Sequence, residues 1–192
     1  MTFGAALRSI LRQDPDIIMI GEMRDTETAE IGIRAAITGH LVLSTLHTND
    51  AASTVTRLVD MGVDAYMVAT SLIGVVAQRL TKKLCPFCKK QRMSTPEEDK
   101  LMEISTGPIP IFEANLAGCP KCLKGYKGRT AIHEILLATQ KMKEIIAAGA
   151  KSEQIAELAR KEGCLLLRDN VSKLVQKGVT DMGELVRVTY SV

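Results

Sequence analysis

The sequence has no Trp, and aromatic side chains make up only 3% of its 192 residues. The hydrophobic core must therefore be filled by aliphatic side chains and the nine Met. The scarcity of aromatics also disfavours a surface on which nucleic-acid bases would stack. No apolar run reaches the roughly 18 residues that cross a bilayer, and Arg8 and Arg12 interrupt the stretch where a signal peptide would be apolar. We therefore predict a cytoplasmic protein with no transmembrane segment.

A glycine-rich phosphate loop ending in Gly-Lys-Ser or Gly-Lys-Thr is also missing from the sequence. The net charge of +3 is too small to indicate a nucleic-acid partner by itself. Residues 1–84 hold 8 Lys and Arg against 9 Asp and Glu, and the remainder holds 17 against 13, so the basic excess is C-terminal. Hydrophobic residues at 46% and charged residues at 24% are typical of a globular protein and argue against disorder.

Strands and helices alternate over the first part of the chain. Buried strands are predicted from Ile17 and over "LVLSTL", which begins at Leu41. Thr26 is a suitable N-cap for the helix between these strands. Helical spacing predicts four helices, over residues 3–13, 26–37, 50–61 and 64–80. The alternation predicts an α/β fold with a parallel sheet covered by helices.

The composition changes at Lys82, where a segment rich in Cys, Pro, Gly and Lys begins. Within it only a short charged helix, residues 96–104, is expected. "RTAIHEIL" then predicts a strand, and amphipathic spacing predicts four C-terminal helices, over residues 141–148, 153–161, 165–176 and 181–190. We expect three parts: residues 1–81, a small module over 82–129, and a helical subdomain over 130–192.

Polar side chains follow both predicted N-terminal strands where each strand ends. Glu22 follows "IIMI", and Thr45, His47 and Thr48 follow the second strand. Ligands of open α/β sheets bind beyond the carboxyl ends of the strands. A Glu there can orient water for attack on a phosphate, directly or through Mg²⁺, and a nearby His can sense the transferred group. The alternative is a solvated turn with a local ion pair to Arg24.

Four of the five Cys form two C-x2-C pairs separated by 30 residues: Cys85, Cys88, Cys119 and Cys122. Four thiolates in paired loops suit tetrahedral Zn²⁺, and four sulfurs leave no open position for catalysis, so a structural zinc is predicted. A rubredoxin-type iron site, reduced unliganded cysteines and a glutaredoxin-like redox site at "CPFC" are alternatives. The redox site is disfavoured because a helix, rather than the strand it needs, is predicted before it. Lysines flank both pairs, and we interpret them as a solvated surface rather than a specific nucleic-acid site; weak attraction to a membrane face is compatible with them.

The stretch "LRSILRQDPDIIMIGEMRDTETAEIGIRAAITGHLVLSTLHTNDAASTVTRL" resembles the central region of the secretion and type IV pilus motor ATPases. "IIMIGEMRD" is similar to their Walker B segment and "TGHLVLSTLHTNDA" to their His box. The likeness continues through "AQRL", the two cysteine pairs and "GYKGRTAIHEIL". It therefore covers nearly the whole chain from Phe3 onward.

The resemblance implies roles for individual residues. Glu22 becomes the Walker B carboxylate that activates water, and His47 lies near the terminal phosphate. The other positions implied to lie in the nucleotide-binding region are Gly21, Arg24, His40, Thr45 and Thr48. Gly21 stands where many Walker B strands have a metal-linked Asp, although a Gly-Glu pair is expected in this family.

The resemblance also implies a fold and partners. The fold is part of a RecA-like P-loop NTPase core, and the complete protein is a cytoplasmic hexamer, peripheral to the inner membrane, that uses ATP and Mg²⁺ and acts with a membrane platform protein. Family members carry the phosphate loop upstream of the position of Met1, so we expect Met1 to be an internal residue and this chain alone to be inactive. The cysteine module points to assembly or secretion rather than pilus retraction. A non-catalytic zinc-stabilised interaction domain and a redox protein are the alternatives.

Overall fold

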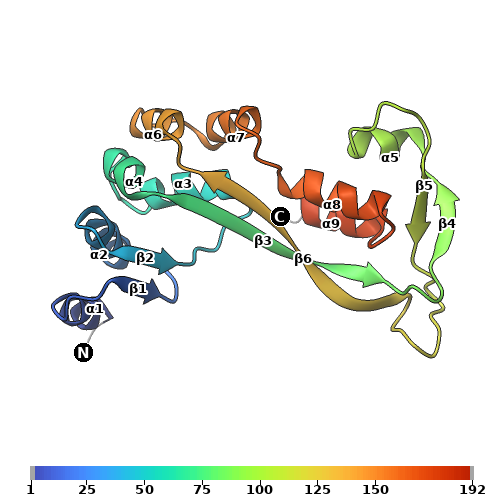
Figure 1. The fold of residues 1–192 in the computed structure, drawn as a ribbon, viewed down its shortest axis with the longest axis horizontal. Helices are drawn as coiled ribbons and strands as arrows, with labels where there is room; N and C mark the ends of the chain where they lie inside the picture. Colours follow the sequence, from blue (N-terminus) through green and yellow to red (C-terminus); the bar gives the residue numbers. More distant parts are fainter. Residues whose placement is uncertain (1–2, 191–192) are drawn as a thin grey trace. The chain divides into compact units, whose positions relative to one another are not determined.

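The computed structural model describes residues 3–190 (Figure 1). By their internal contacts they form two compact units. The first is built from the chain up to Val76 and from residues 135–164, and the second from residues 77–134 and the chain from Leu165 onward. Each unit thus combines stretches that are distant in sequence. The predicted parts 1–81, 82–129 and 130–192 are contiguous segments, and that organisation stays a prediction.

The first unit is built on two short parallel strands, β1 (Ile17–Ile20) and β2 (Leu41–Ser44). Ile17 lies opposite Leu41 and Ile20 opposite Ser44. This confirms the predicted parallel pairing and α/β class. The helices of this unit are α1 (Phe3–Leu11), α2 (Thr26–Ile37), α3 (Ala51–Asp60), α4 (Ala65–Ser71), α6 (Gln140–Ala147) and α7 (Ser152–Lys161).

Helix α2 begins one residue away from the predicted cap. Asp25, not Thr26, is the N-cap, because its carboxylate accepts a hydrogen bond from the backbone N–H of Thr28 at 2.8 Å. The helix packs closely on the strand layer at Gly32, where an added Cβ would lie 2.6 Å from Met23 Cε and 3.0 Å from Ile20 Cδ1. A larger residue at this position would therefore require the ends of the Met23 and Ile20 side chains to move.

The strand pair is covered on one face and exposed on the other. Ile18 and Ile20 are buried, whereas Ile17 and Met19 are 60% and 77% exposed. On β2, Leu41 and Leu43 are also exposed. Parallel strands are normally covered on both faces, and their side chains are accordingly apolar on both. The second face of β1 and β2 is therefore an apolar sheet surface that the described residues leave open.

The prediction of a single helix over residues 64–80 is wrong. Helix α4 ends at Ser71, and Gly74–Leu84 forms a long strand, β3, whose side chains alternate in exposure. It pairs with β6 (Tyr126–Leu137), a strand that extends the predicted "RTAIHEIL" at its N-terminal end. Residues such as Ala77, Gln78 and Leu80 have good helix propensity, but pairing with a distant strand overrides it.

The second unit has a helical and a hairpin part. The hairpin pairs β4 (Lys90–Met93) antiparallel with β5 (Pro110–Glu113), and α5 (Pro96–Leu101) lies between them in sequence. Helices α8 (Leu167–Gln176) and α9 (Met182–Tyr190) complete it. Its core is aliphatic, as the scarcity of aromatics predicts: Met102, Ile111, Ile132, Leu167, Val171, Val175, Met182, Leu185 and Val188 are buried together. No helix within residues 3–190 is long and apolar enough to cross a membrane.

A buried carboxylate links β3 to α9 in this unit. Glu184 is 3% exposed and accepts hydrogen bonds from the Lys82 backbone N–H at 2.8 Å, the Thr81 hydroxyl at 3.1 Å and the Arg187 guanidinium at 2.7 Å. Burial raises the pKa of Glu184, but Arg187 and these donors outweigh it, and the pKa lies below its usual value. The charged form is therefore favoured in the folded protein, as it must be for a buried carboxylate to remain paired.

Replacing Glu184 with Ala is expected to lower the free energy of unfolding by about 3 kcal/mol at neutral pH, because a buried ion pair is broken and its donors are left unpaired. Since the folded-state pKa is below the unfolded value, this contribution is present above the unfolded pKa and is lost as pH falls through the folded pKa. Urea unfolding at neutral and at acidic pH measures the loss of unfolding free energy and its dependence on pH. The matched control is Glu157→Ala, which removes an exposed pair to Lys161 and should leave the free energy of unfolding nearly unchanged. Equal losses for the two variants would contradict the prediction.

Candidate active site and metal centre

The ends of β1 and β2 are tied together just beyond their carboxyl termini. The Thr45 hydroxyl donates to the Gly21 carbonyl at 2.6 Å, and the Met23 backbone N–H donates to the Thr45 carbonyl at 3.1 Å. These bonds continue the parallel ladder past both strands. They hold Glu22, which follows Gly21, beside the segment that carries His47.

Glu22 and His47 meet at this edge. Glu22 Oε2 lies 3.3 Å from His47 Nε2, and Glu22 Oε1 lies 2.6 Å from Arg24 Nη2. The Glu22 side chain is 30% exposed, and its Oε2 is shielded from solvent without a hydrogen-bond partner among the described residues. His47 is 91% exposed. The carboxylate thus has one oxygen engaged by Arg24 and one oxygen that faces His47 and can accept a further donor or a cation.

The charge of Glu22 is stabilised by its neighbours. The Arg24 guanidinium, which donates to the carboxylate, holds the pKa of Glu22 below its usual value; partial burial opposes this shift, and His47 adds to it. Glu22 is therefore ionised at neutral pH. A carboxylate in this state is suited to orienting water or ligating Mg²⁺ rather than to donating a proton.

The side chains of the other two predicted nucleotide-binding residues, His40 and Thr48, make local contacts. His40 precedes β2, at the opposite end of the strand from Thr45, and its Nδ1 lies 3.1 Å from the Ala35 carbonyl at the end of α2. The Thr48 hydroxyl lies 2.7 Å from the Thr54 hydroxyl, at the start of α3. The structure thus brings Gly21, Glu22, Arg24, Thr45 and His47 together and leaves His40 and Thr48 in local contacts.

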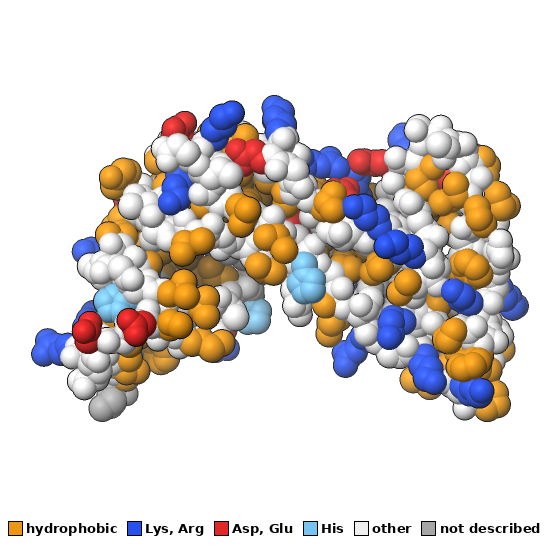
Figure 2. All heavy atoms as spheres, viewed as in Figure 1, with side chains coloured by type: hydrophobic (Ala, Val, Ile, Leu, Met, Phe, Trp, Pro, Cys, Tyr) orange, Lys and Arg blue, Asp and Glu red, His pale blue; other side chains and the backbone are white. Residues whose placement is uncertain are grey.

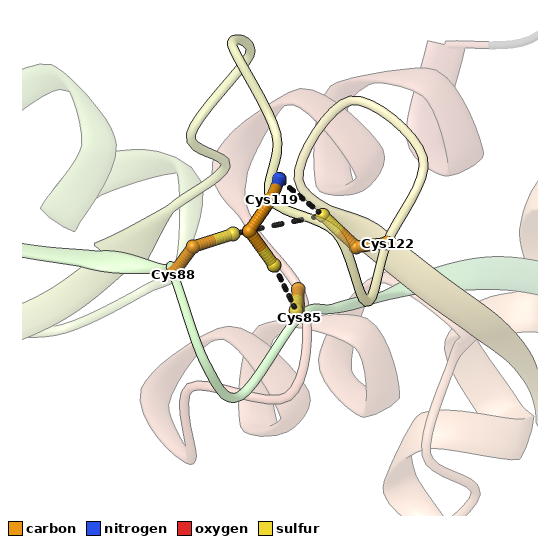
Figure 3. A group of neighbouring side chains, drawn as sticks. All are labelled: Cys85, Cys88, Cys119 and Cys122. Carbon is orange, nitrogen blue, oxygen red and sulfur yellow. Dashed lines mark hydrogen bonds between the residues drawn. The ribbon is translucent and has the colours of Figure 1, made fainter.

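The four paired cysteines converge in the second unit (Figure 3). All four Sγ atoms lie within 4.8 Å of one another. Across the two loops, Cys85 Sγ lies 3.8 Å from Cys119 Sγ, and Cys88 Sγ lies 3.7 Å from Cys122 Sγ. A disulfide would require about 2.05 Å, so these cysteines are reduced.

These distances fit a bound metal. Thiolates about 2.3 Å from a tetrahedral Zn²⁺ are about 3.8 Å apart. The backbone N–H groups of Cys119 and Gly125 oppose the effect of burial and lower the pKa of Cys122 to about 7. By contrast, burial and its hydrogen bonds to the other thiols raise the pKa of Cys88 to about 12. Four adjacent thiolates repel one another unless a cation lies between them, so this donor set can hold a divalent metal ion.

The prediction that a helix precedes "CPFC" is wrong. Strand β3 runs directly to Leu84, so a strand does precede Cys85. What disfavours a simple dithiol is the second pair, because each sulfur of the first loop has a close partner in the other loop. Gly125 was not among the predicted residues of this site; it has φ +83°, and a Cβ there would lie 2.7 Å from the Asn115 carbonyl oxygen. The "KGY" turn directly after the second pair was the available signal.

The family model and the similar proteins both point to the secretion and pilus assembly proteins. A family model described as "Type II/IV secretion system protein" matches residues 1–187. The type II secretion system ATPase E of Vibrio cholerae is 47% identical, and the type IV pilus assembly ATPase PilB of Pseudomonas aeruginosa is 49% identical; each match covers 98% of this chain. The chain spans only 37% and 34% of the length of these two relatives.

Solved structures agree with the family match. The pilus retraction motor PilT with bound ADP superposes with a TM-score of 0.69 at 27% identity, over 97% of this chain and 43% of PilT. The ATPase DotB of Legionella pneumophila superposes with a TM-score of 0.67 at 20% identity, which shows a shared fold. The family model and the two relatives match almost the entire chain, and nearly half of the aligned residues are identical in these relatives. The chain therefore belongs to the type II/IV secretion system protein family, which includes the secretion and pilus assembly ATPases.

Proposed function

We propose that this chain is the second half of a RecA-like core, with its cysteine module and helical subdomain, of a cytoplasmic hexameric ATPase that powers type II secretion or type IV pilus assembly. The observation that carries the proposal is the Glu22–His47 pair at the joined carboxyl ends of two parallel strands. This is the edge at which α/β sheets bind ligands. The open apolar face of β1 and β2 is consistent with a sheet that further strands and helices complete.

In the complete enzyme, Glu22 orients the attacking water and His47 contacts the terminal phosphate of ATP. Oε2 of Glu22, which accepts no hydrogen bond from the described residues, fits a water or Mg²⁺ ligand, because hard cations prefer carboxylate oxygens. Mg²⁺, when bound, neutralises the charge of the phosphates. Arg24 keeps Glu22 ionised, and Thr45 fixes the position of Gly21. We assign no direct contact with ATP to His40, because its ring lies at the other end of β2 from His47, and we keep Thr48, which adjoins His47, as a candidate contact.

The four cysteines hold one structural Zn²⁺ in this proposal. Four sulfur ligands leave no open position for water, so the ion stabilises the loops and takes no part in hydrolysis. Elemental analysis of the purified chain is expected to give close to one zinc per chain. A red, iron-containing protein, or a chain without metal and with two titratable dithiols, would contradict this assignment.

The chain alone, mixed with ATP and Mg²⁺, is not expected to hydrolyse ATP at the rate of a motor ATPase. Its 192 residues contain no glycine-rich loop whose backbone N–H groups and Lys would hold the β- and γ-phosphates. A phosphate-release assay on the purified, folded chain tests this. Turnover near one per second, in the range typical of enzymes, would show that the phosphates are anchored in some other way.

The proposal as a whole is tested with a hybrid protein. The chain replaces the matching region of the Pseudomonas aeruginosa PilB, to which it is 49% identical. The hybrid is expected to form a hexamer and to hydrolyse ATP. A folded hybrid without ATPase activity would instead favour the alternative, a non-catalytic zinc-stabilised interaction domain. In the cell we place the complete protein at the cytoplasmic face of the inner membrane, in contact with the platform protein of its secretion or pilus machine.

A further inference from the structure

The four sulfurs of the metal centre form two pairs, and each pair joins one cysteine loop to the other. Cys85 Sγ lies 3.8 Å from Cys119 Sγ, and Cys88 Sγ lies 3.7 Å from Cys122 Sγ. A disulfide bond is about 2.05 Å long, so the sulfurs of each pair would have to approach each other by about 1.7 Å to bond. Both bonds can therefore form within one chain once a metal ion no longer lies between the sulfurs.

Three of the four cysteines can be reached from solvent. Cys85 is fully buried, whereas the other three are partly exposed. Residues 82–90 and 119–129 contain eight Lys and Arg and no Asp or Glu. Figure 2 shows Lys and Arg side chains over the part of the second unit that carries these loops. Cysteines that react with oxidants lie in such partly exposed, electropositive surroundings, whereas purely structural thiols are buried and inert.

Hydrogen bonds connect the cysteine loops to the other elements of the second unit. The Cys85 backbone N–H donates to the Gly125 carbonyl at 2.8 Å, which joins the first loop to the segment after the second. Lys89 Nζ donates to the Gly178 carbonyl at 2.7 Å, in the turn between α8 and α9. The same ammonium group lies 4.1 Å from the centroid of the Phe112 ring, in β5. Movement of the loops therefore affects both the helices and the hairpin of this unit.

We propose that the four cysteines form a reversible oxidation switch, which releases zinc when the protein meets a peroxide. The inference rests on the zinc site proposed above and does not depend on the proposed ATPase activity. In each pair, one thiolate attacks an oxygen of the peroxide, the O–O bond breaks, and a sulfenic acid and hydroxide form. The second thiolate then attacks the sulfenic sulfur, a disulfide forms, and a second hydroxide leaves.

The electrons for this reaction come from the sulfurs, because Zn²⁺ has no redox chemistry. Each pair gives two electrons to one hydrogen peroxide, and the two hydroxides take up two protons to become water. For the whole cluster, four thiolates, two hydrogen peroxide molecules and four protons give two disulfides and four water molecules. Disulfide sulfurs lack the negative charge of thiolates, so they no longer hold the ion. The loops then lose the constraint that fixes them against α8, α9 and β5.

Zinc release measured with a chromogenic chelator tests the inference on the full, zinc-loaded chain. Excess hydrogen peroxide is expected to lower bound zinc from near one per chain to near zero, and mass spectrometry should find the disulfides Cys85–Cys119 and Cys88–Cys122. Trypsin should cleave after the lysines of the two loops about tenfold faster or more, because cleavage follows local opening. Dithiothreitol with added zinc should reverse all three changes. This reversal excludes methionine sulfoxide as their cause, since that product needs a dedicated reductase.

The matched control is Cys164→Ser, which removes the cysteine outside the cluster. This variant should release zinc at the same rate and form the same two disulfides. Zinc that stays bound in peroxide, disulfides formed within one loop or to Cys164, or changes that dithiothreitol and zinc do not reverse would each overturn the inference. A reduced chain that never contained zinc would instead refute the proposed metal site, and the inference with it. A PilB hybrid that lacks ATPase activity but releases zinc as described would count against the proposed function and leave this inference intact.

Discussion

Replacing Cys85 with Ser is expected to remove the metal from the protein and to unfold the cysteine loops. Cys85 is fully buried, and its sulfur lies 3.8 Å from that of Cys119. Structural zinc sites contribute about 10 kcal/mol or more to folding where metal binding and folding are coupled, which is comparable to the total stability of a domain. Zinc per chain should fall from near one to near zero. The thermal transition of the second unit should be lost or shifted down by tens of degrees.

Cys164→Ser is the matched control for this experiment. Cys164 is partly exposed and lies outside the cluster of four sulfurs. The same Cys-to-Ser change there should leave the zinc content intact and cost at most about 1 kcal/mol, since a partly exposed thiol buries little surface. Full metal content in Cys85→Ser, or equal loss in both variants, would show that the four sulfurs are not the ligands.

Replacing Glu22 with Gln in the PilB hybrid is expected to lower kcat by about a hundredfold to ten-thousandfold, the usual contribution of a group that positions or deprotonates a nucleophile. Glu22 has one oxygen next to Arg24 and one facing His47, and the amide keeps this shape without the negative charge. Binding of ATP should change little, because the phosphates are held by the remainder of the core. Steady-state phosphate release and nucleotide binding separate the two effects.

The neighbouring histidines provide the comparison for this variant. His47→Ala should also reduce kcat, because His47 is the proposed contact with the terminal phosphate. His40→Ala should retain most activity, since His40 lies at the other end of β2 and its ring contacts the Ala35 carbonyl. If His40→Ala were as damaging as His47→Ala, the assignment of the site to the carboxyl edge of the strands would be wrong.

Local patterns were sufficient wherever one property of a short segment decided the structure. The apolar runs at Ile17 and Leu41 predicted the two strands, although not their exposed face, and their parallel pairing brought together the residues that follow them. The C-x2-C spacing predicted the convergence of four sulfurs, because each pair closes a small loop whatever the surrounding fold.

Predictions were less accurate where a distant partner or competing local chemistry decided the structure. Gly74–Leu84 has residues that suit a helix, and it forms a strand because β6 pairs with it. At the start of α2 both Asp25 and Thr26 are good caps, and only the backbone geometry selects Asp25. His40 and His47, the two residues of the His box, lie at opposite ends of β2, and only the structure shows that His47 is the one beside Glu22.

The sequence by itself determined the family, the parallel strands, the carboxylate at their end and the four metal-ligand candidates, because each depends on residue type at short, regular spacing. Only the tertiary structure decided that Glu22 lies within 3.3 Å of His47, that His40 does not share this edge, and that distant stretches combine into each compact unit. The physical reason is that pairing and burial between distant segments are stabilised by contacts that no local pattern encodes, and these contacts outweigh helix propensities of well under 1 kcal/mol per residue.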